Sequence, residues 1–325
     1  MALQTNYQIS CFKLYIYIMS TILITGGTGL VGKTLTAWLV ARSHKVIVLT
    51  RSLKNTATQN NVQYALWDVK KQSIDIPAVQ SADYIIHLAG AGVVDKKWTA
   101  AYKKEIVESR TESSRLLVNT LKENAHSIKA IISSSAIGWY GEDKQSGFAF
   151  TEDDPADEGF LGHTCQLWEE SIEAASELGI RVCKLRTGIV LSNDGGALTE
   201  FKKPVAVGIA AILGNGKQMI SWIHIDDLCR MFLFAVETAG MQGSYNAVAP
   251  QPVTNKELTL KLAQLMKGSF YIPFYVPEFI LKLKLGTRSM EVLKSTTVSC
   301  SKIKKEGFTF IYPGIEAALK QLTEK

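Results

Sequence analysis

Cysteine is scarce in this chain, and its few cysteines stand apart from one another. None of the five belongs to a Cys-x-x-Cys pair: Cys11, Cys165, Cys183, Cys229 and Cys300. Such spacing excludes a disulfide-stapled domain and a zinc ribbon, because both need closely spaced partners. His163 and Cys165 are the one His/Cys proximity, and no further ligand stands near them, so we expect no metal site. The sequence predicts reduced thiols in a cytoplasmic protein.

The chain also lacks an apolar run long enough to cross a membrane. The N-terminal run at 11–18 is interrupted by Lys13, whereas a membrane-spanning helix needs about 20 apolar residues. It has neither the cationic start nor the small-residue cleavage site of a secretory signal. Since Met19 leads directly into a strand pattern, we expect residues 1–18 to be a non-native or disordered extension. A short membrane-surface tether is the alternative.

No stretch of the sequence concentrates positive charge. The net formal charge is +6, and the densest basic group, formed by Lys302, Lys304 and Lys305, is short. We therefore expect no nucleic-acid partner and interpret the basic residues as solvated surface. A hydrophobic content of 46% over 325 residues is enough for the core of a large α/β domain with a smaller annex.

What the chain does have is a glycine-rich turn, Thr-Gly-Gly-Thr-Gly-Leu-Val-Gly at 25–32, between an apolar strand pattern and a helical pattern. Such glycines permit a tight turn, close approach of phosphates and close helix–strand packing. The N–H groups and dipole of the helix start favour negative charge. An ordinary tight turn is the alternative, but the context predicts a dinucleotide pyrophosphate on Gly26, Thr28, Gly29, Leu30 and Val31.

The end of the next strand pattern, at 45–50, indicates which dinucleotide binds. An NAD site usually carries Asp or Glu there to bind the ribose 2′-hydroxyl. This chain has Arg51, flanked by Thr50 and Ser52, and a guanidinium can hold a 2′-phosphate through charge-assisted bonds. A solvated loop cation is the alternative, but the position favours NADP(H). After the third strand, Asp68 is expected either to meet the adenine amino group or to cap a loop.

The chain alternates strand and helix patterns in the manner of a doubly wound parallel sheet. We predict strands at 20–25, 45–50, 62–66, 83–88, 129–134 and 181–186, and helices at 30–42, 99–124 and 161–178. The fourth strand ends in Leu88, Ala89 and Gly90, which would let the cofactor pass over the switch point of the sheet.

The fold expected is therefore an α/β Rossmann domain at 19–245 with a small, mostly helical C-terminal domain at 246–325. Pro273, Pro277 and Pro313 suit short helices in that annex. Residues 192–221 are expected to contribute to its substrate-facing side.

Several motifs together resemble a known family. They are the glycine turn, His-Leu-Ala-Gly-Ala-Gly at 87–92, Ser-Ser-Ser-Ala-Ile-Gly-Trp-Tyr-Gly at 133–141 and Trp-Ile-His-Ile-Asp-Asp-Leu at 222–228. The chain resembles the NAD(P)-dependent epimerase/dehydratases, the extended short-chain dehydrogenase/reductases. It is most similar to an atypical branch marked by Trp98, Ser109-Arg110, Cys165 and Trp168-Glu169, with a C-terminal domain of unassigned function. The resemblance spans about 19–323 and implies cofactor contacts at Ser133 and Arg186.

The resemblance also exposes a gap in the expected catalytic machinery. The family uses a Ser or Thr with a Tyr and a Lys four residues later, and the Tyr phenol exchanges a proton while nicotinamide carries the hydride. Ser135 matches the Ser, but Leu161 and Cys165 stand where the Tyr and Lys belong. Tyr140 and His163 are the candidate replacements. A packed aromatic and a surface residue are the respective alternatives.

Aromatic residues and one further histidine complete the candidate site. Trp98, Trp139 and Trp222 are candidates for a substrate-pocket wall, although core packing explains any one of them alone. His224 is substrate-proximal or structural in this superfamily, and the following Asp226-Asp227 pair is expected to cap the next helix. We therefore expect an NADP(H)-binding oxidoreductase or epimerase with a small carbonyl, alcohol or sugar-like substrate. The alternative is a non-catalytic NADP(H)-binding regulator or sensor.

Overall fold

A large, mostly parallel sheet forms the body of the computed structural model, which describes residues 19–54, 60–145 and 147–324. The extension predicted at 1–18 lies outside these ranges. The strand order is β12–β7–β6–β5–β1–β2–β3–β4, and only the β3–β4 pair is antiparallel. In chain order the strands are β1 (Thr21–Thr25), β2 (Lys45–Thr50), β3 (Val62–Asp68), β4 (Ser73–Ile74), β5 (Tyr84–His87), β6 (Ala130–Ala136), β7 (Arg181–Thr187) and β12 (Gly243–Ala247).

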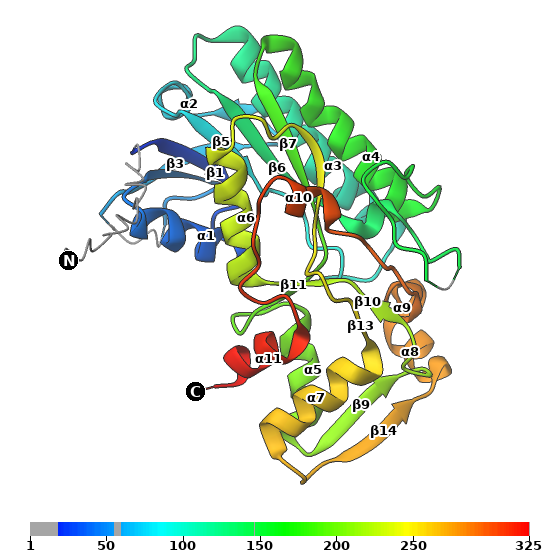
Figure 1. Ribbon diagram of the computed structural model, residues 1–325. Helices are drawn as coiled ribbons and strands as arrows, with labels where there is room; N and C mark the ends of the chain where they lie inside the picture. The colour runs from blue at the N-terminus through cyan, green and yellow to red at the C-terminus, as the bar shows by residue number, and fades with distance from the viewer. Residues whose placement is uncertain (1–18, 55–59, 146, 325) are drawn as a thin grey trace, which may run out of the picture.

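The first strand, β1, lies in the middle of the sheet, and the order in which strands are added reverses beside it. The chain runs outward through β2 and β3 and then returns to β5 on the other side of β1 (Figure 1). This reversal is the topological switch point of a doubly wound sheet, where such folds bind ligands. The six strands predicted from the sequence are confirmed, with ends that differ by at most two residues.

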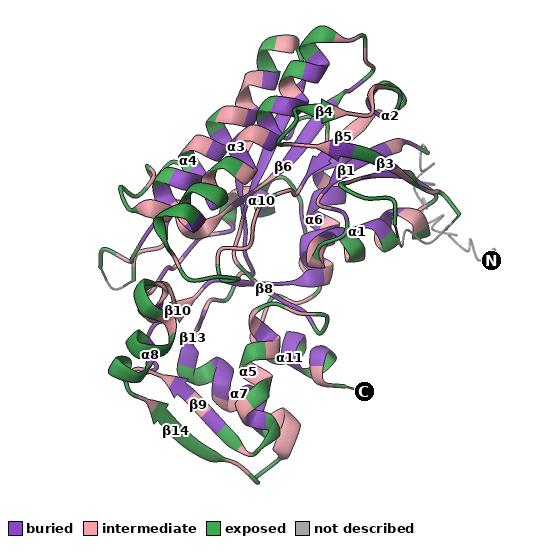
Figure 2. Ribbon diagram, turned by 180° about the vertical axis from the view of Figure 1, so that it is seen from behind, coloured by how far each residue is buried: buried purple, intermediate pink, exposed green. Residues whose placement is uncertain are grey.

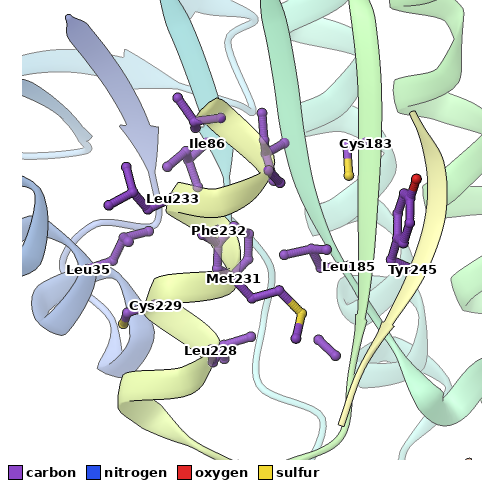
Figure 3. Packing of buried hydrophobic residues seen from close by; sticks show 14 of the residues in the cluster. Leu35, Ile86, Cys183, Leu185, Leu228, Cys229, Met231, Phe232, Leu233 and Tyr245 are labelled. Atoms are coloured by element: carbon purple, nitrogen blue, oxygen red, sulfur yellow. The ribbon is translucent and has the colours of Figure 1, made fainter. Parts of the chain in front are cut away.

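Helices cover both faces of this sheet, which explains the continuous apolar runs of its central strands. On one face lie α1 (Leu30–Ala41) and α6 (Ile225–Glu237); on the other lie α2 (Ile76–Gln80), α3 (Ala100–Glu123) and α4 (Phe160–Glu173). Figure 3 shows Met231 and Phe232 of α6 facing Leu185 of β7 in the first of these cores. The predicted helix at 161–178 is α4 followed by a 3₁₀ turn, η2 (Ala174–Leu178).

A smaller part lies beyond the carboxyl ends of the strands, below the sheet in the view of Figure 1. Its core joins α5 (Ala197–Ala206), α7 (Asn255–Lys267) and α11 (Ile315–Thr323). Beside them lie β9 (Ile209–Leu213), β14 (Ile272–Val276), α8 (Glu278–Leu285), η3 (Gly286–Arg288) and α9 (Ser289–Leu293). The short parallel pair β8 (Ile189–Leu191) and β11 (Trp222–His224), with β10 (Met219–Ile220) and β13 (Val253–Thr254), connects the two parts.

The smaller part differs from the expected, mostly helical C-terminal domain near two of its prolines, where a strand is found. Pro273 lies within this strand, β14, and Pro277 directly follows it. The strand pairs with β9 and leaves most of its side chains exposed (Figure 2). The C-terminal segment also returns to the large sheet, where α10 (Ser301–Lys305) packs on β12. The boundary at 245 and 246, which falls within β12, remains a prediction. Within the described ranges, no helix is both long and apolar enough to cross a membrane.

Candidate functional site

The glycine turn lies at the carboxyl end of β1, with its backbone pressed against the loop after β5. Gly26 has a left-handed φ of 68°, and a Cβ on it would lie 2.9 Å from the Leu88 carbonyl. A Cβ on Gly32 would overlap the Gly26 carbonyl. Only glycine therefore permits both the turn and the close approach of α1 to it. On the other side of the turn, a Cβ on Gly27 would lie 2.7 Å from the Val48 side chain of β2.

The start of α1 is free to bind an anion. Its N-cap is Gly29, no side chain caps it, and its first turn holds no acidic residue. Thr28 and Gly29 are exposed and Leu30 and Val31 are half-buried, so the start of the helix, with its unpaired N–H groups, lies near the surface. A Cβ on Gly196, the N-cap of α5, would lie 3.2 Å from the Leu30 side chain, so the turn that precedes α5 lies beside the start of α1. A cofactor pyrophosphate fits this cradle by both shape and charge.

Arg51 lies beside this turn, one residue beyond β2. The register pairs Leu49 with Thr25, so Thr50 and Arg51 continue past the level at which Gly26 begins. Arg51 is exposed and makes neither a hydrogen bond nor an ion pair with the rest of the described chain. Asp68, by contrast, accepts the N–H groups of Lys70 and Lys71 at 3.0 and 3.2 Å, which is a loop-capping role. The adenine contact of Asp68 remains a prediction.

A buried ion pair gathers several of the predicted site residues between β6, β7 and α4. Arg186 donates to both carboxylate oxygens of Glu169, at 2.8 and 3.0 Å, and Ser135 Oγ donates to the same carboxylate at 2.7 Å. Arg186 Nη1 also donates to the Tyr140 hydroxyl, which in turn donates to Asn246 Oδ1 at 2.6 Å. The guanidinium stacks 3.7 Å from the centre of the Trp139 ring. Ser135, Tyr140, Trp139 and Arg186 thus form one network.

Glu169, which holds this network, had no role assigned from the sequence. It lies four residues after Cys165 and eight after Leu161, which places all three on one face of α4. A glutamate on the buried face of an amphipathic helix is the signal that would have identified it, because a buried carboxylate needs a partner. Ser133 is also fully buried, and its hydroxyl donates to the Ser134 carbonyl at 3.1 Å.

No free acid or base stands where the family's proton donor is expected. Leu161 and Cys165 lie against Gly138, and the Cys165 thiol donates to the Ala136 carbonyl. Burial raises the pKa of Cys165 to about 12, although the charge of Arg110 opposes this. Burial likewise raises the pKa of Tyr140 to about 12 despite the neighbouring Arg186. Both groups therefore stay protonated at neutral pH.

The remaining candidates are distributed over different environments. His163 is exposed on α4, and its side chain makes no hydrogen bond to any described residue. Trp98 is half-buried, donates to the Val93 carbonyl at 2.8 Å and meets Phe160 edge to face. These two residues lie outside the Ser135 network.

Trp222 and His224 both make buried structural contacts, as the alternatives of core packing and a structural role expect, and their substrate contact remains a prediction. Trp222 is 0% exposed in the core of the smaller part, where it donates to the Gln251 carbonyl at 2.9 Å. His224 Nδ1 accepts from the Asp226 N–H, so the histidine caps α6 and the expected capping by Asp226-Asp227 is wrong. Asp227 instead accepts the backbone N–H groups of Ile311 and Tyr312.

Two cavities lie at the opposite edge of the sheet. One of about 740 Å³ is lined by Arg181 and Gly243, and one of about 540 Å³ by Thr21, Lys45 and Val62. These are the first residues of their strands, whereas ligands of doubly wound sheets bind beyond the last. We therefore place the site at the glycine turn. Over residues 19–324, apart from the two gaps, no His, Cys, Asp or Glu cluster has metal-binding geometry.

Comparison with known proteins shows the family to which the chain belongs. Residues 22–247 match the model of the NAD dependent epimerase/dehydratase family, and 276–322 match a domain of unknown function, DUF1731. Epimerase family protein YfhF of Bacillus subtilis is 34% identical, over 93% of this chain and 97% of that protein.

Solved structures extend the likeness. The human epimerase family protein SDR39U1 (isoform 2) with NADPH is 25% identical with a TM-score of 0.80, covering 93% of this chain and 99% of that one. A nucleoside-diphosphate sugar epimerase of Corynebacterium glutamicum is 30% identical with a TM-score of 0.74, over 94% of this chain and 58% of that one. This chain belongs to the NAD dependent epimerase/dehydratase family.

Proposed function

We propose that the protein is a cytoplasmic NADP(H)-dependent oxidoreductase or epimerase that acts on a small carbonyl, alcohol or sugar-like substrate. The observation that carries this is the uncapped, exposed start of α1 at Gly29, with the cation of Arg51 beside it. A human relative of the same fold was solved with NADPH. The described cysteines are all free and buried, which suits a reducing compartment.

The residues of this chain would divide the work between binding and proton handling. The glycine turn would hold the pyrophosphate and Arg51 the 2′-phosphate, while the bound nicotinamide supplies hydride chemistry. Ser135 is the candidate hydroxyl for a substrate: it donates its one proton to Glu169 at 2.7 Å, which leaves its oxygen to accept from a substrate hydroxyl. Tyr140 and His163 are the further candidates for moving a proton.

A non-catalytic NADP(H)-binding regulator is the second candidate, and a specific observation favours it. Leu161 cannot exchange a proton, and the buried thiol of Cys165 stays neutral. Tyr140 is committed to Asn246 and Arg186. A protein of this kind would bind the cofactor without turning it over.

The test is to measure NADPH binding by calorimetry and then NADPH oxidation against a panel of aldehydes, ketones and sugar nucleotides. On any active substrate, Ser135→Ala should lower kcat by about 10²–10⁴-fold. The neighbouring half-buried Ser134→Ala serves as control, with Tyr140→Phe and His163→Ala in parallel. Turnover unaffected by all three site changes rejects this catalytic site. NADPH binding without turnover favours the regulator, and failure to bind NADPH rejects both.

A further inference from the structure

Arg110 of α3 is a buried cation that the proposed chemistry has not used. It is 9% exposed, and no carboxylate lies within ion-pair distance of it among residues 19–54, 60–145 and 147–324. Its guanidinium lies 4.9 Å from the centre of the Trp168 ring, and Nη1 donates to the carbonyls of Ala91 and Ile106 at 3.0 and 2.9 Å. An arginine stays charged in such surroundings.

Most of the hydrogen-bonding capacity of this guanidinium is unused. Both bonds come from Nη1, while Nε and Nη2 donate to no acceptor in the described chain. Burying a cation without a carboxylate is costly, and two carbonyl dipoles and a ring face offset only part of that cost. The free donors therefore suit oxygen acceptors supplied from outside the chain.

The surroundings of Arg110 show which ligand its donors can reach. A Cβ on Gly90 would lie 3.1 Å from the guanidinium carbon, so the bare backbone after β5 rests against the charge. The charge also acts on the thiol of Cys165, across from α3 on α4. Cys165 occupies the position where the resemblance implies the family's lysine.

The strand order indicates which half of the cofactor would lie near Arg110. Arg51 follows β2 on one side of β1, whereas Gly90 follows β5 on the other side. A dinucleotide whose 2′-phosphate lies at Arg51 and whose pyrophosphate lies at the glycine turn must continue toward β5, β6 and α4. We propose that Arg110 replaces the missing lysine by binding oxygen atoms of the nicotinamide half of the cofactor, its ribose hydroxyls or the adjoining phosphate. This inference rests on the proposed function.

Calorimetry with three ligands tests it without any turnover assay. NADPH and NADH contain the nicotinamide half, and 2′,5′-ADP contains only the adenine half with its 2′-phosphate. Arg110→Met should weaken NADPH and NADH by about 10- to 150-fold, the loss of a charge-assisted hydrogen bond, and leave 2′,5′-ADP within about twofold. Arg115→Met is the matched control, because Arg115 lies on α3 in an exposed ion pair with Glu112 and should change nothing.

Other outcomes overturn the inference. Equal weakening of all three ligands would assign Arg110 a structural role, and unchanged NADPH binding would remove it from the site. If Arg110→Met fails to fold, Arg110→Lys keeps the charge and should still weaken NADPH and NADH selectively, because lysine cannot reproduce the planar donors. Equal or absent losses in that variant also overturn the inference. A wild-type protein that binds none of the ligands refutes the proposed function itself.

Discussion

Thr25 Oγ1 lies 2.7 Å from His87 Nδ1, and this bond joins the carboxyl ends of β1 and β5 at the switch point. The same hydroxyl oxygen accepts the N–H groups of Leu88 and Ala89, both at 3.1 Å. Its own proton is therefore directed to His87, which makes Nδ1 the acceptor and leaves the ring hydrogen on Nε2. His87 Nε2 then donates to Ser114 Oγ of α3 at 3.2 Å.

This chain of bonds fixes the loop over which the cofactor would pass. Without the Thr25 hydroxyl, the Ala89 N–H and the His87 ring nitrogen would lose their partner, whereas the Leu88 N–H would keep the Thr25 carbonyl at 3.2 Å. Thr25 and His87 are both 0% exposed. The threonine is thus a structural requirement of the switch point.

Replacing Thr25 by valine should destabilise the protein by at least about 2 kcal/mol, since each buried group left unsatisfied costs about 1–3 kcal/mol. Urea unfolding followed by circular dichroism measures the change. Thr25→Ser keeps the hydroxyl and should lose less than half as much. If valine and serine behave alike, the hydroxyl network does not stabilise the loop.

The buried imidazole of His87 should make stability depend on pH. Burial, with the charge of Arg110 adding to it, lowers the pKa of His87 from 6.5 to about 3. The unfolded chain therefore takes up a proton at His87 between pH 6.5 and 3, whereas the folded chain does not. Stability should be full above pH 6.5 and fall below it by up to about 1.4 kcal/mol per pH unit from this residue.

Urea midpoints at pH 7, 6 and 5 measure this slope. His87→Asn should reduce the slope of the unfolding free energy with pH by the contribution of one titrating group. The contributions of His44 and His224, whose pKa values burial also lowers, should persist. An unchanged slope in the His87 variant would show that the ring takes up its proton over the same pH range in the folded protein as in the unfolded chain.

The doubly wound sheet was predictable because its information is local. Ile22, Leu23 and Ile24 are all 0% exposed, so the strand appears in the sequence as an uninterrupted apolar run. The strand β14 was not predictable in this way. Pro273 lies within it and can donate no hydrogen bond, yet β14 pairs with β9 on one side only, and an edge strand tolerates proline.

In the candidate site, too, the parts that are local in sequence were predictable and those that depend on tertiary packing were not. The glycine turn is contiguous in sequence, so its geometry could be anticipated. The partners of Ser135 could not, because Glu169 and Arg186 come from different elements and meet only after α4 packs on the sheet. Trp222 and His224 belong to a family motif, and motif membership alone does not separate a buried cap from a ligand contact.

Arg51→Ala should weaken NADPH binding by about 10- to 150-fold and leave NADH binding nearly unchanged. The reason is that the guanidinium would contact only the 2′-phosphate, through bonds worth about 1.5–3 kcal/mol. Calorimetry with both cofactors measures the difference, and Lys54→Ala, an exposed cation three residues later, controls for general charge. Equal loss for both cofactors would remove Arg51 from cofactor selection.

The buried pair of Glu169 and Arg186 should be far more sensitive to substitution than a surface pair. Their side chains are 7% and 4% exposed, so Glu169→Gln leaves an uncompensated cation in the core and should cost about 3–5 kcal/mol. Glu112→Gln breaks the exposed pair with Arg115 and should cost less than about 1 kcal/mol. Urea unfolding of both variants gives the comparison.

The double variant Glu169→Gln with Arg186→Met separates charge from packing. If the loss in the single variant comes from the unpaired cation, removing that cation as well should restore part of the stability. Ser135 would still have an amide oxygen to donate to, so its position should survive in the double variant. A double variant less stable than Glu169→Gln alone would mean that packing of the guanidinium on Trp139, rather than its charge, is what the core depends on.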